Sequence, residues 1–349
     1  MHFHHLHFYV ENAANWRDWF IQMLAFQPLT AFQQADRHTE VLAQGAIQIR
    51  LSAPLDQNGS VACYLQAHPP GVADIAFAVT DLDAWVSRAR AQGARLPDPT
   101  AAALPGQTER CCQIQGWGDL CHTLVEVDPD WLERQPRGTY LSTIDHTVLN
   151  VPEGQLAAAI AWYAAVFGFE PRQSFTIETA HSGLCSQVIG HPDGTAQLPI
   201  NQPSSQNSQI QEFLTHNRGA GIQHVALGCP DMVSTISAFR DRGLPLISVP
   251  FTYYDSLQLR SGAAEAEVDW RAIAAQSILV DWAADNTAAR LLQTFTQPIF
   301  AEPTFFFEFI QRSRYRDGSR VKTAQGFGEG NFRALFEAIE RAQMQRGSL

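Results

Sequence analysis

Apolar and polar positions recur along this chain in a pattern that indicates an internal repeat. Residues 19–28 and 162–171 match position by position, and each has the spacing of an amphipathic helix followed by its exit. In the second copy, Gly168 stands where a helix terminates through a left-handed residue. Residues 74–81 align without gaps with residues 224–231, and both segments are strand-like. The pattern predicts two copies of one architecture. Each copy contains, twice in succession, a strand, a helix and several further strands.

This repeat predicts the fold class and the domain boundaries. We expect an α+β protein of two similar domains, each built from paired βαβββ modules that form a curved, open barrel of mixed sheet. The polar stretch at 128–138 is broken by prolines, which is typical of a linker. We therefore place the two domains at residues 1–135 and 140–349.

A further helix is expected at the end of the chain. Its apolar positions follow helical spacing and are Phe332, Leu335, Phe336 and Ile339. One face of this terminal helix is therefore apolar and must pack against another part of the protein.

Composition and charge exclude several classes of protein. Of 349 residues, 45% are hydrophobic and 17% charged, as in a globular protein rather than a disordered one. No apolar run approaches the roughly 18 residues of a membrane span, and the first residues lack the pattern of a signal peptide. A formal charge of −11 and the absence of a Lys/Arg cluster argue against nucleic acid as a partner. We expect a cytoplasmic enzyme whose six cysteines are reduced thiols.

Three distant segments each carry one strong metal ligand. His146, His224 and Glu308 each lie within a short apolar, β-prone run. Two histidines and one carboxylate, with coordination positions left open, form the ligand set of a non-haem Fe(II) centre that activates dioxygen. The spacings are 224 − 146 = 78 and 308 − 224 = 84 residues. Only a fold that brings distant strands together makes these residues one site.

Each candidate ligand also has a simpler structural interpretation. A single histidine in a strand is more often a hydrogen-bonded core residue than a ligand. A buried Glu308 needs a partner, and an arginine such as Arg312 or Arg314 could supply it instead of a metal. The repeat favours the metal, because His146 and His224 begin equivalent strands of two modules and are expected to face each other.

The N-terminal half contains residues of the same types. His5, Asp74 and, less securely, Glu126 are the expected counterparts of the three ligands. We expect a relic of duplication rather than a second metal site, because that half lacks the polar and aromatic residues found around the C-terminal set. Whether these three residues keep any affinity for metal is open from the sequence.

Several motifs in the C-terminal half are typical of one family. They are residues 198–201 (Leu-Pro-Ile-Asn), 221–226 (Gly-Ile-Gln-His-Val-Ala), 252–254, 291–295, 307–312 (Phe-Glu-Phe-Ile-Gln-Arg) and 326–332 (Gly-Phe-Gly-Glu-Gly-Asn-Phe). In these motifs the chain resembles the 4-hydroxyphenylpyruvate dioxygenase family of the vicinal oxygen chelate superfamily. The resemblance is strong over about residues 140–349 and mostly architectural over 1–135.

The resemblance implies an activity and a set of site residues. Fe(II) would be held by His146, His224 and Glu308. 4-Hydroxyphenylpyruvate and O2 would be converted to homogentisate and CO2. The catalytic polar lining would be Ser186, Asn201, Gln223 and Gln293. Further substrate contacts would come from Gln209, Phe295, Phe306, Phe327 and Phe332. The terminal helix would cover the pocket as a lid, and the protein would form a homodimer or homotetramer.

Two other functions stay open at this point. A hydroxymandelate synthase shares fold, metal and substrate but hydroxylates the benzylic carbon, and an aliphatic residue is typical there at the position of Phe332, so phenylalanine favours homogentisate. A metal-free small-molecule binding protein on the same scaffold belongs to another class, and the complete His/His/Glu set argues against it. The sequence does not decide whether the product feeds tyrosine catabolism or the biosynthesis of tocopherol and plastoquinone.

Overall fold

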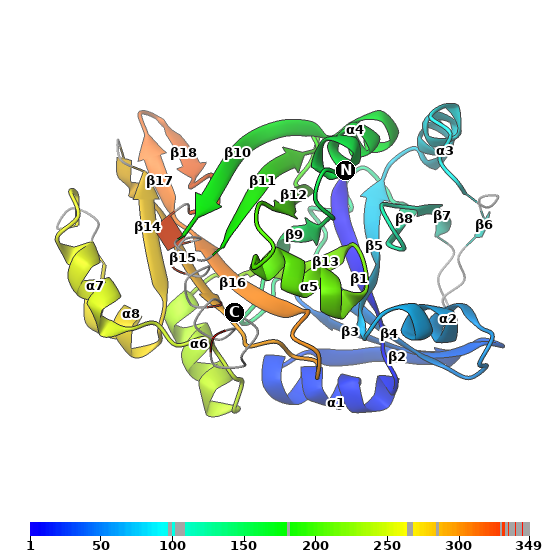
Figure 1. Cartoon of the computed structure of the whole chain (residues 1–349), viewed down its shortest axis with the longest axis horizontal. Coiled ribbons are helices and arrows are strands. Elements are labelled where there is room, and N and C mark those ends of the chain that lie inside the picture. Colours follow the sequence, from blue (N-terminus) through cyan, green and yellow to red (C-terminus); the bar gives the residue numbers. More distant parts are fainter. Residues whose placement is uncertain are drawn as a thin grey trace.

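Two eight-stranded mixed sheets form most of the molecule (Figure 1). The computed structural model describes residues 1–96, 100–101, 109–179, 182–263, 268–283 and 286–328, and the single positions 330, 331, 334, 339 and 344. The first sheet comes from residues before 127 and the second from residues after 143. The predicted linker therefore lies between the two sheets, and the domain boundary placed there stays a prediction.

The first sheet has the strand order β2-β3-β4-β1-β5-β8-β7-β6. Its elements in chain order are β1 (His2–Tyr9), α1 (Ala13–Leu24), β2 (Gln27–Gln33), β3 (Arg37–Gln44), β4 (Ile47–Pro54), α2 (Ser60–Ala67), β5 (Gly71–Val79), α3 (Leu82–Ala91), β6 (Thr100–Ala101), β7 (Arg110–Gln115) and β8 (Cys121–Glu126).

The second sheet has the equivalent order β10-β11-β12-β9-β13-β16-β15-β14. Its elements are β9 (Ile144–Asn150), α4 (Leu156–Phe167), β10 (Glu170–Glu178), β11 (Gly183–Gly190), β12 (Gln197–Pro203), α5 (Gln209–Asn217), β13 (Gly221–Gly228), α6 (Met232–Asp241), α7 (Phe251–Gln258), α8 (Trp270–Ala275), β14 (Leu279–Ala283), β15 (Asn286–Phe295) and β16 (Phe306–Arg312). A separate hairpin of β17 (Arg314–Asp317) and β18 (Arg320–Thr323) follows. No helix among the described residues is both long and apolar enough to cross a membrane.

Strand pairing confirms the predicted fold of paired βαβββ modules. Within each module the first strand runs parallel to the last, as in β9 with β12 and β13 with β16. The two first strands of each sheet lie side by side and antiparallel, β1 with β5 and β9 with β13. The strands of His146, His224 and Glu308 are therefore consecutive neighbours in the second sheet.

Helix ends repeat between modules for local reasons. Asp81 and Asp231 are the N-caps of α3 and α6, and each side chain accepts a hydrogen bond from the backbone amide three residues later. Gly168 ends α4 with a φ of 70°, as predicted, and Ala25 occupies the same position after α1 with a φ of 56°. The first copy thus tolerates a left-handed alanine where the second uses glycine.

β16 divides its side chains between two environments. Phe307 points into the apolar core shared by the two sheets, where its ring centroid lies 6.3 Å from that of Phe8 and 5.9 Å from that of Phe20. Strand alternation then directs Phe306 and Glu308 to the opposite, concave face of the second sheet. Burial of the aromatic residues against the first sheet therefore decides which way the carboxylate points.

The C-terminal segment packs on that concave face. Ala334 and Ile339 contact the apolar cluster of Leu279, Phe295 and Phe306, and the described positions from 330 onward are helical. These described positions agree with the predicted terminal helix, and its role as a lid stays a prediction. The described residues do not include Phe332, Leu335 and Phe336, so their roles stay predictions.

His122 in β8 links the two halves of the molecule. Its ring is buried, with Nε2 2.9 Å from Oη of Tyr163 in α4 and Nδ1 3.3 Å from the carbonyl oxygen of Ile75. Burial lowers the pKa of His122 to about 4, against a smaller opposing effect of the hydrogen bond to Ile75. An unfolded histidine titrates near 6.5, so between about pH 6.5 and 4 the unfolded chain binds this proton and the folded chain does not. This group therefore makes the free energy of unfolding fall as the pH falls through that window.

We expect His122→Phe to lower the free energy of unfolding at pH 7 by about 1–3 kcal/mol, because the buried hydroxyl of Tyr163 loses its partner. Between pH 6.5 and 4 the free energy of unfolding should fall less steeply in this variant than in the wild type, because the variant lacks the histidine whose pKa is lowered by folding. Urea unfolding across this pH range measures both effects. Tyr163→Phe is the control, which should lose stability at pH 7 but keep the wild-type pH dependence. Identical pH slopes in His122→Phe and wild type would contradict this role.

Candidate metal centre

A β-bulge in β9 sets Asp145 beside His146. Ala226 of β13 is opposite His146, but the next residue, Leu227, is opposite Ile144, so Asp145 is an extra residue in β9. Ile144 consequently packs in the apolar core, while His146 faces the concave side. Asp145 Oδ1 then lies 2.8 Å from His146 Nδ1. Simple alternation separates sequence neighbours onto opposite faces, so it does not predict this contact.

A second bulge, in β13, lies beside His224. Ile222 is opposite Leu149 and His224 is opposite Val148, so Gln223 is the extra residue. Ile222 turns into the apolar core, and Gln223 is buried on the same side as His224. The bulge therefore gives the predicted lining residue Gln223 a place on the concave face.

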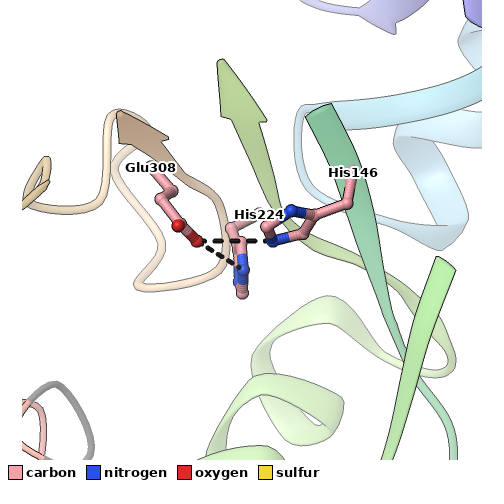
Figure 2. A group of neighbouring side chains, drawn as sticks. All are labelled: His146, His224 and Glu308. Carbon is pink, nitrogen blue, oxygen red and sulfur yellow. Dashed lines mark ion pairs between the residues drawn. The ribbon is translucent and has the colours of Figure 1, made fainter. Parts of the chain in front are cut away.

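His146, His224 and Glu308 converge from three adjacent strands (Figure 2). Oε2 of Glu308 lies 3.4 Å from Nε2 of His146 and 3.5 Å from Nε2 of His224. One ligand atom from each residue lies within 4.8 Å of the other two, and all three side chains are buried. The structure thus brings together the three residues that the sequence proposes as ligands.

Neither arginine proposed as a structural partner neutralises Glu308. Arg312 forms a bidentate ion pair with Asp145, in which its Nε and Nη2 lie 2.7 and 2.8 Å from the two carboxylate oxygens. Arg314 is exposed in the β17–β18 hairpin. Oε1 of Glu308 instead accepts a hydrogen bond of 2.9 Å from Nε2 of Gln293, and Oε2 is left facing the imidazoles.

Protons are distributed unevenly over the three candidate ligands. Burial lowers the pKa of His146, but the charge of Glu308 and hydrogen bonds with Asp145 and Glu308 outweigh it and raise this pKa to about 9. Burial raises the pKa of Glu308, yet the two histidines outweigh it and bring this pKa to about 2. For His224, burial dominates and lowers the pKa. Without a metal, the group therefore holds one proton on His146 against an ionised carboxylate.

This group fits a divalent metal ion. Ligand atoms at right angles on an octahedral ion stand on the order of 3 Å apart, close to the 3.4 and 3.5 Å found from Glu308 to the two histidines. A divalent ion would take the place of the proton that balances Glu308. Asp145 holds the imidazole of His146 through Nδ1, as carboxylates commonly do behind metal-binding histidines. His224 has no such support, because its Nδ1 is buried without a hydrogen-bond partner among the described residues.

Buried polar atoms without partners lie on the strand of His146 and on its neighbours β12 and β11. Ser186, Asn201 and Asn150 form one row across β11, β12 and β9, because they are register partners. Within the part of the chain that the structure describes, no hydrogen-bond partner exists for Ser186 Oγ, Asn201 Oδ1, Asn150 Nδ2 and Gln209 Oε1. Burying such atoms unpaired costs free energy, so their clustering indicates a polar ligand. Asn150 belongs to this row although it is not among the predicted lining residues.

Gln293 differs from Ser186, Asn201 and Gln209, because both the nitrogen and the oxygen of its amide are already paired. Nε2 donates to Glu308 Oε1 at 2.9 Å and to the carbonyl oxygen of Phe327 at 3.2 Å. Oε1 accepts a hydrogen bond of 2.7 Å from Nδ2 of Asn331. Gln293 therefore joins the candidate ligand Glu308 to the C-terminal segment. Asn331 is not among the predicted site residues, and its place in the 326–332 motif is the feature of the sequence that points to it.

Aromatic rings flank both histidines. The ring of Phe306 stacks on that of His224, with centroids 4.8 Å apart and planes at 20°. The ring of Phe327 meets that of His146 edge-on at 4.9 Å. Phe295 lies 6.2 Å from Phe306. Three of the four predicted aromatic contacts therefore gather at this site, and the fourth lies outside the described residues.

The N-terminal sheet repeats the geometry of this site without its ligand set. Bulges in β1 and β5 match those in β9 and β13, so His5 and Asp74 occupy the register positions of His146 and His224. Both N-terminal residues are buried. These two predicted counterparts therefore do lie at the equivalent positions.

The prediction that Glu126 corresponds to Glu308 is wrong. The register of β5 with β8 places Thr123 at that position, and Thr123 Oγ1 donates to Asp74 at 2.6 Å. Glu126 instead caps α3 by accepting a hydrogen bond of 3.1 Å from the amide of Leu82. Sequence alone does not show a register difference of three residues between the two halves.

The concave face of the N-terminal sheet is also more polar than predicted. His7 Nε2 and Thr39 Oγ1 each lie 2.7 Å from Ser52 Oγ. These groups pair with one another, whereas the equivalent row at Ser186 and Asn201 leaves polar atoms unpaired. Across the described ranges, only the C-terminal cluster groups three or more His, Cys, Asp or Glu side chains closely enough to hold a metal.

Comparison with known proteins identifies the family. Models of the Glyoxalase/Bleomycin resistance protein/Dioxygenase superfamily match residues 4–108 and 143–258. The 4-hydroxyphenylpyruvate dioxygenase of Caenorhabditis briggsae is 34% identical over 99% of this chain and 93% of its own length. That of Sus scrofa is 34% identical over 100% of this chain and 93% of its own length. This chain belongs to the 4-hydroxyphenylpyruvate dioxygenase family.

A solved structure supports the same fold. A triple mutant of 4-hydroxymandelate synthase from Streptomyces coelicolor aligns with a TM-score of 0.84 over 98% of both chains, at 27% identity. Fold and family make this chain an enzyme of the dioxygenase type on the vicinal oxygen chelate scaffold. They do not distinguish between the two reactions that these relatives are named for.

Proposed function

We propose that this protein is an Fe(II)-dependent dioxygenase that converts 4-hydroxyphenylpyruvate and O2 to homogentisate and CO2. The observation that carries the proposal is the convergence of His146, His224 and Glu308 on a face lined with unpaired polar atoms. Two histidines and one carboxylate on one side of the ion suit Fe(II) and leave positions for an α-keto acid and dioxygen. Because the keto acid is part of the substrate, no separate 2-oxoglutarate is required.

The chain's own residues would bind and orient the substrate. When bound, Fe(II) would supply Lewis-acid and redox chemistry. Ser186, Asn201 and Gln209 offer a hydroxyl and two amides, which can bind a phenol without imposing a charge. The rings of Phe327 and Phe306 lie beside the histidines, where offset or edge contacts with an aromatic substrate are favourable. The terminal helix would exclude water from the reacting centre.

The reaction itself tests the proposal. Protein purified anaerobically and loaded with Fe(II) and ascorbate should consume O2 on addition of 4-hydroxyphenylpyruvate and release equimolar homogentisate and CO2. Protein that binds no iron and shows no oxygen uptake would favour the metal-free binding protein instead. We further propose a cytoplasmic homodimer or homotetramer, serving tyrosine catabolism or tocopherol and plastoquinone biosynthesis.

4-Hydroxymandelate synthesis is the second candidate, favoured by the structural similarity to a 4-hydroxymandelate synthase. Both reactions consume the same substrate and release CO2, so oxygen uptake does not separate them. Chromatography of the product does, because hydroxymandelate keeps its side chain at the original ring carbon. Phenylalanine at position 332 supports homogentisate.

We expect Ser186→Ala to raise KM for 4-hydroxyphenylpyruvate about fivefold, because a hydrogen bond to substrate is worth about 1 kcal/mol. The ligand-free protein should be no less stable than the wild type, since the hydroxyl has no partner to lose. Thr39→Val is the matched control, because Thr39 holds the equivalent position in the first sheet but bonds to Ser52. It should lower the melting temperature and leave KM unchanged. A destabilised Ser186→Ala variant with an unchanged KM would contradict the lining role.

A further inference from the structure

Arg312, the last residue of β16, contacts two different parts of the candidate metal centre. Its side chain is only 13% exposed, and every nitrogen of its guanidinium has an acceptor. Such a planar group can satisfy several acceptors at once in fixed directions, which a lysine ammonium cannot do.

One group of contacts reaches a metal ligand. Nε and Nη2 of Arg312 bind both oxygens of Asp145 at 2.7 and 2.8 Å. The same Asp145 Oδ1 lies 2.8 Å from Nδ1 of His146. Asp145 is the extra residue of the β9 bulge, which brings its carboxylate beside the imidazole of His146. The bidentate pair therefore orients the carboxylate that orients the imidazole.

The other group of contacts holds the segment that leads to the terminal helix. Nη1 of Arg312 donates to the carbonyl oxygens of Ala324 and Gly326 at 3.2 and 2.8 Å. Gly326 has a φ of 85°, a left-handed turn that brings its carbonyl toward the guanidinium. The next residue is Phe327, whose ring packs edge-on against His146 at 4.9 Å and lies 5.8 Å from the guanidinium carbon. Arg312 thus touches the chain immediately before a ring that covers the site.

We propose that Arg312 is a positioning residue that couples the orientation of His146 to the docking of the segment 324–327 over the metal. Through Asp145 it sets the direction of the imidazole, and through two carbonyl groups it holds the turn that carries Phe327. The two effects share one rigid group, so loosening one contact loosens the other. This inference rests on the proposed metal centre and holds for either of the two candidate reactions.

Metal binding and hydrogen exchange separate this role from a merely structural ion pair. Arg312→Lys keeps the positive charge but not the planar guanidinium. Asp145→Asn leaves Arg312 in place but removes the charge and one of the two oxygens of the side chain that binds both Arg312 and His146. We expect Co(II), followed by its visible absorption bands, to bind each variant about 10–100-fold more weakly than wild type, with a shifted spectrum. The losses should not add in the double variant, because both substitutions break one chain of contacts. Amides of residues 324–328 should exchange at least about tenfold faster in Arg312→Lys, and also faster, by a smaller factor, in Asp145→Asn, because the guanidinium that holds this segment is no longer fixed by Asp145.

Arg260→Lys is the matched control for metal binding. Arg260 also binds a carboxylate, Asp281, and a carbonyl oxygen, that of Trp282, but neither acceptor contacts a metal ligand. The affinity of the Arg260→Lys variant for Co(II) and its visible spectrum should equal those of the wild type. Wild-type Co(II) affinity and spectrum in Arg312→Lys, or additive losses in the double variant, would overturn the inference while leaving the proposed function intact. Failure of the wild type to bind Co(II) or Fe(II) would instead overturn the proposed function.

Discussion

Glu308→Gln should abolish turnover and almost all metal binding. The substitution keeps the shape of the side chain and an oxygen for Gln293, but removes the negative charge that faces both imidazoles. We expect Fe(II) to bind at least about 100-fold more weakly and kcat/KM to fall at least about 10³-fold, since a bound metal contributes several kcal/mol to the transition state. Isothermal titration with Fe(II) under nitrogen and oxygen-uptake kinetics measure the two quantities.

A surface glutamate supplies the control for this prediction. Glu302 lies 3.0 Å from Nδ1 of His216, so it too is a carboxylate beside an imidazole, but both side chains are exposed. Glu302→Gln should bind Fe(II) and turn over as the wild type does. Thermal unfolding in the presence of EDTA verifies that both variants are folded. If Glu308→Gln retained one tightly bound iron per chain, the assignment of Glu308 as a ligand would be wrong.

Gln293→Leu should have the second largest effect, because one amide serves three buried partners. Leucine fills a similar volume but leaves Glu308 Oε1, the carbonyl oxygen of Phe327 and Nδ2 of Asn331 without this partner. We expect metal affinity and kcat/KM to fall about 10–100-fold, as for other residues that orient a metal ligand. The free energy of unfolding should fall by about 1–3 kcal/mol. Metal titration, steady-state kinetics and urea unfolding test these expectations.

Gln311→Leu separates the effect on the site from the loss of a hydrogen bond. Gln311 lies in the neighbouring strand β16, and its Oε1 accepts a hydrogen bond of 2.7 Å from the amide of Met232 at the start of α6. Its replacement should cost about 1 kcal/mol of stability, as loss of a helix cap does, without changing metal affinity. Equal losses of metal affinity in the two variants would mean that Gln293 acts through general stability alone.

The direction in which Glu308 points follows from the local sequence pattern. In 306–310 the sequence reads as a buried strand, and alternation separates the core residue Phe307 from the concave-face residues Phe306 and Glu308. The repeat adds that the strands of His146 and His224 are equivalent. Both inferences hold because periodicity and duplication are properties of the chain itself.

Alternation gives the wrong face for residues at a β-bulge. Alternation alone places Gln223 away from His224 and Asp145 away from His146, and both placements are reversed by one extra residue in a strand pair. A bulge is a property of two paired strands, so it is not written in either strand's pattern. The mistaken match of Glu126 to Glu308 has the same origin, because register is decided by pairing across the sheet.

The sequence by itself determined the repeated βαβββ architecture, the three metal-ligand candidates and the polar and aromatic residue types around them. These follow from spacing and side-chain chemistry, which are local. Only the tertiary structure decided that Arg312 pairs with Asp145 rather than Glu308, that Gln293 is committed to Glu308 and Phe327, and that Ser186 and Asn201 keep unpaired polar atoms. The physical reason is that a hydrogen-bonding group takes whichever partner the packed strands bring within about 3 Å, and that choice depends on register and bulges in the whole sheet.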